Sequence, residues 1–420
     1  MLSSVLKSGA LLTGGTVAAG LLSYGFIVLA ARGLGPEEFG SLGVLLTFLY
    51  FASAIVQGVT TLVTRYAALT SAEDRSAVTD LMRSATLTVG TYSAAGFVIY
   101  LALSPLIDSL LDIDNLPAVI TIGVVCLLRA FTGVVSGGLQ GLDRFGLMSL
   151  AIALESALRF ALGLVLMTVG FTLLRSTSAY AVAAVVPTLI MALMLPMNWR
   201  RFFSERPRRS ELAVTGDAFL IGGSFLLIAL LTQLDMVAAK YFLSAEVAGY
   251  YAAASNLVRA PFLMLAGAFA YAMYPSVVRA GAYSHQGVRL LLTTSAVVLA
   301  AIAIATATCY IVPQTIVGVL LGADFMPLAG WLGLFAAGSA APALLFVVTR
   351  YHMACRPTLL IWLLLVGLVV ELVIILLLHT SPQHVILATA LGSLTPLLPL
   401  SVMALKNRTL RLRATGDSAR

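Results

Sequence analysis

Long runs of apolar residues recur along this chain, and they constrain its fold more than any other feature. A helix needs about 20 mostly apolar residues to cross the hydrocarbon core of a membrane. Such runs fall at about residues 11–31, 41–64, 81–103, 117–140, 147–170, 179–198, 216–239, 247–275, 288–311, 328–349, 358–378 and 384–404. The sequence therefore predicts an all-α membrane protein with twelve transmembrane helices. The run at 247–275 is long and contains Pro261, which predicts a tilted or kinked helix there.

The composition agrees with a membrane protein. Of the 420 residues, 60% are hydrophobic and only 10% are charged, with a mean hydropathy of +1.01, whereas soluble domains carry about 25% charged residues. The three cysteines lack the close spacings of metal or redox motifs, and no Gly-x-x-x-x-Gly-Lys-Ser/Thr phosphate loop occurs. We therefore expect no cofactor, no metal, no ATP hydrolysis by this chain and no enzymatic activity.

The two halves of the chain resemble each other. The stretch Leu34-Gly35-Pro36-Glu37-Glu38-Phe39-Gly40 has a counterpart in Leu243-Ser244-Ala245-Glu246-Val247-Ala248-Gly249. Aligning residues 11–40 with residues 220–249 without a gap gives nine identities. Self-similarity at a fixed offset indicates a duplicated unit. We therefore predict two parallel six-helix repeats, with lobes at 1–206 and 207–420.

Basic residues are distributed unevenly along the predicted topology. If the N-terminus is cytoplasmic, nineteen of the 25 Lys and Arg residues lie in inner segments or in the first turns of helices next to them, and only Arg32, Arg175 and Lys240 lie on the outer side. Cytoplasmic loops retain positive charge, so both termini are predicted to be cytoplasmic. The net charge of +7 is explained by this bias, including the Arg-rich join between the halves, and we expect contact with membrane lipids and no nucleic-acid partner.

A few charged residues lie within the predicted spans. They are Arg129, Glu155, Arg159, Asp235, Arg259 and Glu371. A charge in the bilayer costs several kcal/mol unless it is paired or hydrated, by estimates of about 2.5–3.5 kcal/mol for Arg or Asp at a helix centre. Each of these residues is therefore a candidate for function.

The arginines allow two interpretations. Glu155 and Arg159 are four residues apart and share a helix face, so they can form a self-neutralising structural pair. Alternatively, Arg129, Arg159 and Arg259 line a water-filled cavity between the halves and bind an anionic head group, since guanidinium offers paired donors to phosphate. Both interpretations remain open at this point.

Carboxylates within spans commonly couple transport to protons or sodium, which makes Asp235, Glu155 and Glu371 candidates for this role. Asp235 occupies the position of Phe26 in the first half. It also lies five residues from Lys240 near the predicted outer interface, so a surface ion pair with that lysine is the alternative. Glu371 has a weaker case, with His379 and His384 in the outer loop that follows.

Four stretches resemble a known family. They are Ala31-Arg32-Gly33-Leu34-Gly35-Pro36-Glu37-Glu38-Phe39-Gly40, Leu139-Gln140-Gly141-Leu142-Asp143-Arg144-Phe145, Glu155 with Arg159, and Ala248-Gly249-Tyr250-Tyr251-Ala252-Ala253-Ala254. The chain is similar over nearly its full length to polysaccharide flippases, the oligosaccharidyl-lipid exporters related to multidrug and toxin extrusion transporters. This resemblance implies a V-shaped pair of lobes around a cationic cavity.

The resemblance also implies a function. A polyprenyl-pyrophosphate-linked glycan would move from the inner to the outer leaflet of the cell membrane by alternating access, with its pyrophosphate held by Arg129, Arg159 and Arg259. A proton or sodium ion would be a further partner, as would a glycan polymerase or glycosyltransferases. The alternatives are an ion-coupled multidrug exporter of the same superfamily, which needs a less cationic cavity, and a membrane glycan polymerase, which needs a long outer loop.

Overall fold

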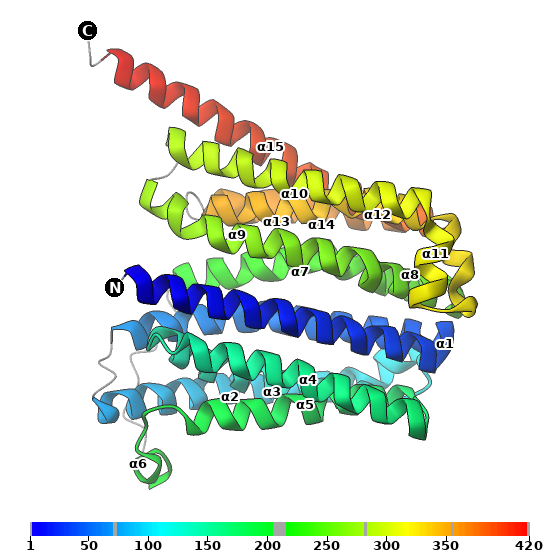
Figure 1. Ribbon diagram of the computed structural model, residues 1–420, viewed down its shortest axis with the longest axis horizontal. Coiled ribbons are helices and arrows are strands. Elements are labelled where there is room, and N and C mark those ends of the chain that lie inside the picture. Colours follow the sequence, from blue (N-terminus) through cyan, green and yellow to red (C-terminus); the bar gives the residue numbers. More distant parts are fainter. Residues whose placement is uncertain (1, 70–73, 205–215, 281–283, 354–356, 418–420) are drawn as a thin grey trace. The chain divides into compact units, whose positions relative to one another are not determined.

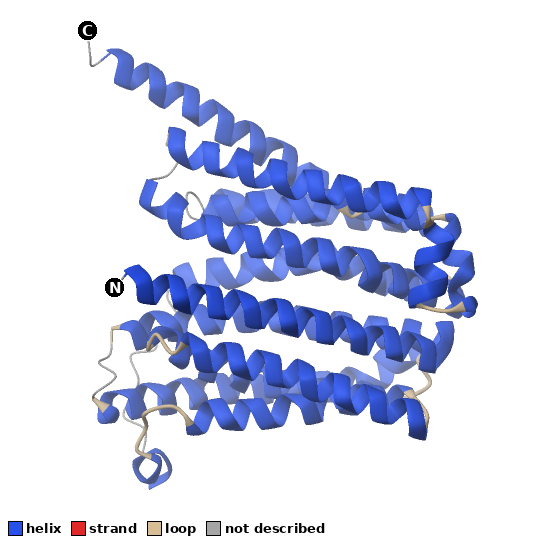
Figure 2. Cartoon of the chain, viewed as in Figure 1, coloured by secondary structure: helices blue, strands red, loops and turns tan. Residues whose placement is uncertain are grey.

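The computed structural model describes residues 2–69, 74–204, 216–280, 284–353 and 357–417. Within these ranges the chain is helical and contains no strand (Figure 2). It divides into two compact units, Met1–Phe225 and Leu226–Arg420. The predicted boundary between residues 206 and 207 falls in a segment outside the described ranges, so it stays a prediction.

The helices of the first unit form a bundle (Figure 1). They are α1 (Leu2–Ala68), α2 (Arg75–Leu110), α3 (Leu116–Gly141), α4 (Phe145–Val169), α5 (Leu173–Leu193) and the short α6 (Trp199–Ser204), followed by the beginning of α7 (Gly216–Phe242). Most of α7 belongs to the second unit.

The second unit continues with a more interrupted series of helices (Figure 1). They are α8 (Ala245–Ala254), the π-helix η1 (Ser255–Arg259), α9 (Ala260–Ala280), α10 (His285–Ile311), α11 (Pro313–Leu320), the 3₁₀-helix η2 (Ala323–Gly330), α12 (Leu332–Gly338), α13 (Ala340–Met353), α14 (Pro357–Leu377) and α15 (Pro382–Asp417). The short α11 and η2 lie in the connection between α10 and α12.

Helix α1 contains two of the predicted crossings. Its 67 residues would reach about 100 Å if they were straight, because a helix rises about 1.5 Å per residue. Gly35 breaks the helix with φ 73° and ψ 175°, a conformation that is essentially restricted to glycine. Figure 1 shows α1 as two segments that run in opposite directions. The described residues contain eleven helical stretches long and apolar enough to cross a membrane, and the bend makes them twelve crossings, as predicted.

Several helices begin where a polar side chain caps free backbone amides. The side chains of Asn115, Thr172, Ser244 and Ser284 each accept a hydrogen bond from an amide of the first turn, of α3, α5, α8 and α10 respectively. Asp74 caps α2 in the same way, and the Ser76 hydroxyl together with the Ala77 amide lowers the pKa of this exposed carboxyl. These polar residues therefore mark where the apolar runs start to be helical.

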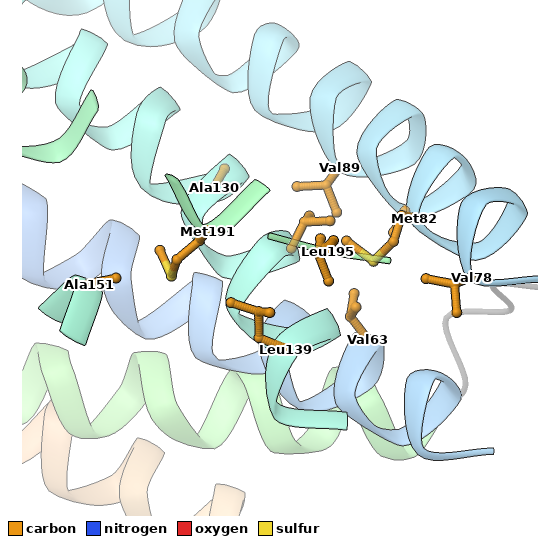
Figure 3. Packing of buried hydrophobic residues seen from close by; sticks show 11 residues of the cluster. Val63, Val78, Met82, Val89, Ala130, Leu139, Ala151, Met191 and Leu195 are labelled. Carbon is orange, nitrogen blue, oxygen red and sulfur yellow. The ribbon is translucent and has the colours of Figure 1, made fainter. Parts of the chain in front are cut away.

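The first unit is held together by close contact between α1 and α3. A Cβ atom added to Gly137 would lie 2.8 Å from the carbonyl oxygen of Thr60, and one added to Gly141 would lie 2.5 Å from the Cβ of Ala67. Small residues at such spacing let membrane helices pack at short distance. Beside this contact, buried side chains from α1 to α5 form an apolar core (Figure 3), which includes Val63, Met82, Leu139 and Met191.

The expected distortion near Pro261 takes the form of a π-helical turn. Residues 255–259 are π-helical, and the amide of Ala260 bonds to the carbonyl of Ser255, five residues earlier. Proline cannot donate to the preceding turn, and a widened turn just before it removes the need for that bond. The turn ends at Arg259 and thereby sets the position of a buried arginine, a common use of π-bulges.

Candidate functional site

The first unit contains a cluster of one carboxylate and two guanidinium groups. Arg129 of α3 donates two hydrogen bonds to Glu155 of α4, from Nη1 to Oε2 at 3.0 Å and from Nη2 to Oε1. Arg159, one turn after Glu155, donates from Nη2 to the same Oε1 at 3.2 Å. The side chains are 22% exposed for Arg129 and 11% for the other two. With two guanidinium groups and one carboxylate, the cluster therefore has an excess of one positive charge.

An aromatic ring and unused donors complete this cluster. The guanidinium carbon of Arg159 lies 4.5 Å from the ring centroid of Tyr180 in α5, within the range of a cation–π contact. The Nε atoms of Arg129 and Arg159 are buried and have no hydrogen-bond partner among the described residues. Buried donors are usually satisfied, so this site has hydrogen-bonding capacity for a further acceptor.

The second unit contains a tighter ion pair. Arg259 donates from Nη1 to Oδ1 of Asp235 at 2.7 Å and from Nη2 to Oδ2. The Tyr251 hydroxyl donates to Oδ2 of the same carboxylate, and Arg259 also donates to the Thr232 carbonyl at 2.9 Å. The side chain of Arg259 is 2% exposed and that of Asp235 is 0% exposed. This pair is bidentate, buried and electrically balanced.

Glu371 lies in α14 and is fully buried. Its Oε1 accepts a hydrogen bond from Thr389 of α15 at 3.1 Å, while its Oε2 is buried without a partner among the described residues. Ala238 of α7 packs with Ile375 of α14, and Asp235 and Glu371 each lie about one turn before these residues. The two carboxyl groups therefore lie at a similar height on neighbouring helices.

These contacts decide some of the predicted alternatives. The predicted pairing of Glu155 with Arg159 is present, but Arg129 joins it. The surface position considered for Asp235 beside Lys240 is wrong, because Asp235 is fully buried and its carboxylate is held by Arg259. Arg259 lies in a different unit from the other two arginines, and each of the three guanidinium groups is paired with a carboxylate. Their predicted role in a cavity between the halves stays a prediction.

Sequence reasoning missed the partners of the charged residues. Tyr180, Tyr251 and Thr389 each complete a charged group. Tyr180 and Thr389 carry no sequence signal of their own, and Tyr251 lies in a stretch that resembles the family but has no predicted role there. The pairings of Arg129 with Glu155 and of Arg259 with Asp235 span 26 and 24 residues and join neighbouring helices. Arginines and carboxylates in apolar runs need partners. The sequence therefore predicts that such residues are paired, but it does not predict which residues pair.

Comparison with known proteins identifies the family. The sequence profile of the polysaccharide biosynthesis proteins matches residues 5–280. The chain belongs to the polysaccharide biosynthesis protein family. The resemblance found from the sequence motifs is thereby confirmed. No curated protein is significantly similar to this polysaccharide biosynthesis protein in sequence.

Solved structures share its fold. The lipid II flippase MurJ in an inward closed conformation has a TM-score of 0.71 and 14% identity, covering 95% of this chain and 90% of MurJ. An inward-facing multidrug resistance transporter of the MATE family has a TM-score of 0.65 and 15% identity, covering 93% and 95%. A MOP superfamily transporter from Pyrococcus furiosus, described as having a binding pocket of reversed polarity, has a TM-score of 0.60 and 15% identity, covering 96% and 95%. This polysaccharide biosynthesis protein is thus a multi-pass membrane protein with the MOP superfamily transporter fold.

Proposed function

We propose that this protein is a flippase that moves a polyprenyl-pyrophosphate-linked oligosaccharide, or a similar anionic glycolipid, from the inner to the outer leaflet of the cytoplasmic membrane. The observation that carries this proposal is the cluster in the first unit, where two guanidinium groups share one carboxylate. An uncompensated cation within membrane-spanning helices is costly, and a phosphate ligand removes that cost. Membership of the polysaccharide biosynthesis family supports a glycan as the cargo.

The geometry suits an anion bound at Arg129. This side chain is the most exposed of the cluster, and its Nε–H donates to no described residue. The Glu155 carboxylate holds Nη1 and Nη2 and so fixes the plane of the guanidinium group. A phosphate beside the exposed part of this side chain would be attracted by its positive charge without any need to break the existing pair. Arg159, one turn after Glu155 in α4, adds a second positive charge to the cluster.

The experiment is transport in proteoliposomes of a fluorescent short-chain polyprenyl pyrophosphate that carries a tetrasaccharide. Arg129→Met removes the excess charge but leaves Glu155 neutralised by Arg159, so the fold should survive. We expect transport to fall by about 10- to 100-fold, because hydrogen bonds to charged groups contribute about 1.5–3 kcal/mol.

The matched control is Arg144→Met. Arg144 lies at the turn between α3 and α4 and donates to the Met194 carbonyl at 2.8 Å. This variant therefore makes the same substitution at an arginine outside the charged cluster. It should retain transport near the wild-type rate. Equal rates for Arg129→Met and wild type would refute anion binding at this cluster.

Ion coupling is assigned to Glu371. Its carboxyl group has one oxygen without a partner, whereas Asp235 is held by Arg259 and Glu155 by two arginines, so Glu371 has the most freedom to exchange a proton. Glu371→Gln should therefore abolish stimulation of transport by a pH gradient while leaving gradient-free exchange in place. A gradient response that persists in this variant would exclude Glu371 as the coupling residue.

An ion-coupled multidrug exporter of the same superfamily is the second candidate, since MATE transporters share the fold. A cationic drug needs a site with excess negative charge, and the cluster of the first unit has the opposite sign. Uptake of ethidium by the same proteoliposomes, with no movement of the pyrophosphate probe, would favour this candidate.

A further inference from the structure

The second segment of α1 carries a stripe of polar side chains within its apolar run. Tyr50, Ser53, Gln57 and Thr61 recur at intervals of three or four residues, so they share one face of the helix. Tyr50, Gln57 and Thr61 are exposed. The Thr61 hydroxyl donates a hydrogen bond to the backbone carbonyl of Gln57 at 2.8 Å. The Gln57 carboxamide makes no hydrogen bond within the part of the chain that the structure describes.

Helix α3 carries a second stripe with the same spacing. It consists of Arg129, Thr132, Ser136 and Gln140, all of them half-buried. Thr132 lies 2.8 Å from the hydroxyl of Thr188 in α5. This stripe continues from the charged cluster along the helix, so the excess positive charge of the first unit stands at one of its ends.

The two stripes lie on the same side of the packed pair α1 and α3. Thr64, which follows Thr61 on the first stripe, donates to Oε1 of Gln140 at 3.2 Å and thereby joins the two at one end. The contact of Thr60 with the carbonyl of Gly133 at 3.2 Å sets the relative height of the helices and places Arg129 near the level of Ser53. From Tyr50 to Thr64 the stripe extends about 21 Å at 1.5 Å per residue.

The chemistry of the stripes identifies their environment. An exposed carboxamide without partners costs several kcal/mol in hydrocarbon, so this face of the first unit must be hydrated. Apart from Arg129 its groups are neutral hydroxyls, amides and one phenol ring. Hydroxyl and amide groups both donate and accept hydrogen bonds, which matches a neutral ligand rich in hydroxyls.

We propose that these stripes form a hydrated track that binds the glycan part of the cargo, while Arg129 at one end holds the pyrophosphate. The track consists of Tyr50, Ser53, Gln57, Thr61 and Thr64 of α1 with Thr132, Ser136 and Gln140 of α3. The inference rests on the proposed function, because it assigns the sugar to a site beside the phosphate. It predicts that these side chains determine which glycans are transported.

The first test measures hydration by the reaction of single cysteines with a membrane-impermeant maleimide, in a chain whose three native cysteines are replaced by alanine. Gln57→Cys lies on the track. Thr91→Cys is the control, because Thr91 is an exposed residue of α2 that bonds to the Leu87 carbonyl at 2.7 Å.

The two sites have similar depth. A Cβ atom at Gly90 would contact Phe131, whereas a Cβ atom at Gly133 would contact Val56, and Phe131 and Gly133 are only two residues apart. We expect Gln57→Cys to react at least about tenfold faster than Thr91→Cys. Equal reaction rates would show a lipid-facing stripe and would overturn the inference.

The second test compares transport of two probes, a short-chain polyprenyl pyrophosphate without sugar and the same lipid with a tetrasaccharide. Gln57→Leu should slow the tetrasaccharide probe about tenfold, roughly the effect of one lost hydrogen bond, and leave the sugar-free probe unchanged. Thr61→Val should act in the same direction, and Thr91→Val should change neither rate.

The outcomes separate this inference from the proposed function. Equal slowing of both probes by Gln57→Leu would contradict a sugar-binding role. Unchanged transport of the tetrasaccharide probe would do the same while leaving the flippase proposal in place. If wild-type protein moves neither probe, the flippase proposal fails, and the glycan-binding role of the track fails with it. The maleimide reaction rates alone then decide whether the stripe is hydrated.

Discussion

The charged residues within the spans are all held by partners, yet the two units balance their charges differently. In the second unit Asp235 and Arg259 neutralise each other through two hydrogen bonds. In the first unit Glu155 is shared between Arg129 and Arg159. A balanced buried pair suits a structural role, whereas a cluster with excess charge suits ligand binding, because the ligand completes it.

The structural role of Asp235 and Arg259 can be tested by a double-mutant cycle. Arg259→Met leaves a buried carboxylate without its cation and should destabilise the protein by about 3–5 kcal/mol. Asp235→Leu together with Arg259→Met removes both charges and should recover most of that loss. Thermal unfolding in detergent measures both effects. A double variant as unstable as Arg259→Met alone would contradict this account of the pair.

Elements in this chain end where the backbone needs an unusual conformation. Gly35 separates the two crossings of α1 by adopting a positive φ, and Pro36 disfavours helical backbone at the residue before it. In the second unit the π-helix η1 absorbs the effect of Pro261 without ending the helix. The repeated motif around Gly35 therefore marks a reversal of the chain, since its counterpart at Leu243 to Gly249 joins α7 to α8.

The requirement at Gly35 predicts a strong effect of a small substitution. Gly35→Ala adds a Cβ at φ 73° and should cost about 1–3 kcal/mol, seen as a lower melting temperature in detergent. The comparison is Gly96→Ala in α2, where an added Cβ meets no atom within 4 Å and the backbone is helical. That change should be neutral or stabilising. Similar melting temperatures for the two variants would rule out backbone strain at Gly35.

At the scale of the whole molecule, twelve crossings return the chain to the side from which it started. The bias of basic residues predicts that this side is the cytoplasm. Arg144 lies between the fourth and fifth crossings and Gly170 between the fifth and sixth, so the two loops are expected on opposite sides of the membrane. Alternating access requires such a defined orientation, because the proposed cargo starts in the inner leaflet.

Reporter fusions test this orientation. Fluorescent protein attached after Arg420 should fluoresce, and alkaline phosphatase inserted after Gly170 should be active, because the first folds in the cytoplasm and the second only outside it. A phosphatase fusion after Asp143 serves as the inactive control. Active phosphatase at Asp143 with an inactive fusion at Gly170 would reverse the predicted topology.

Much of the architecture follows from the sequence alone. The apolar runs predict twelve crossings, the offset repeat predicts two halves, and the rarity of charged residues within spans singles out the residues that form the two charged sites. These features depend on the free energy of transferring side chains from water into hydrocarbon, which each residue contributes separately along the chain. The reversal at Gly35 is likewise predicted by a glycine next to a proline.

Only the tertiary structure decided which charges meet. Arg129 binds Glu155 because α3 packs near α4, and Arg259 binds Asp235 because α7 lies near η1. The close fit of Gly137 and Gly141 against α1 fixes how α1 and α3 pack. The same packing aligns the polar stripes of α1 and α3. A sequence specifies that a buried charge needs a partner, but the choice among partners is made by how the helices pack in three dimensions.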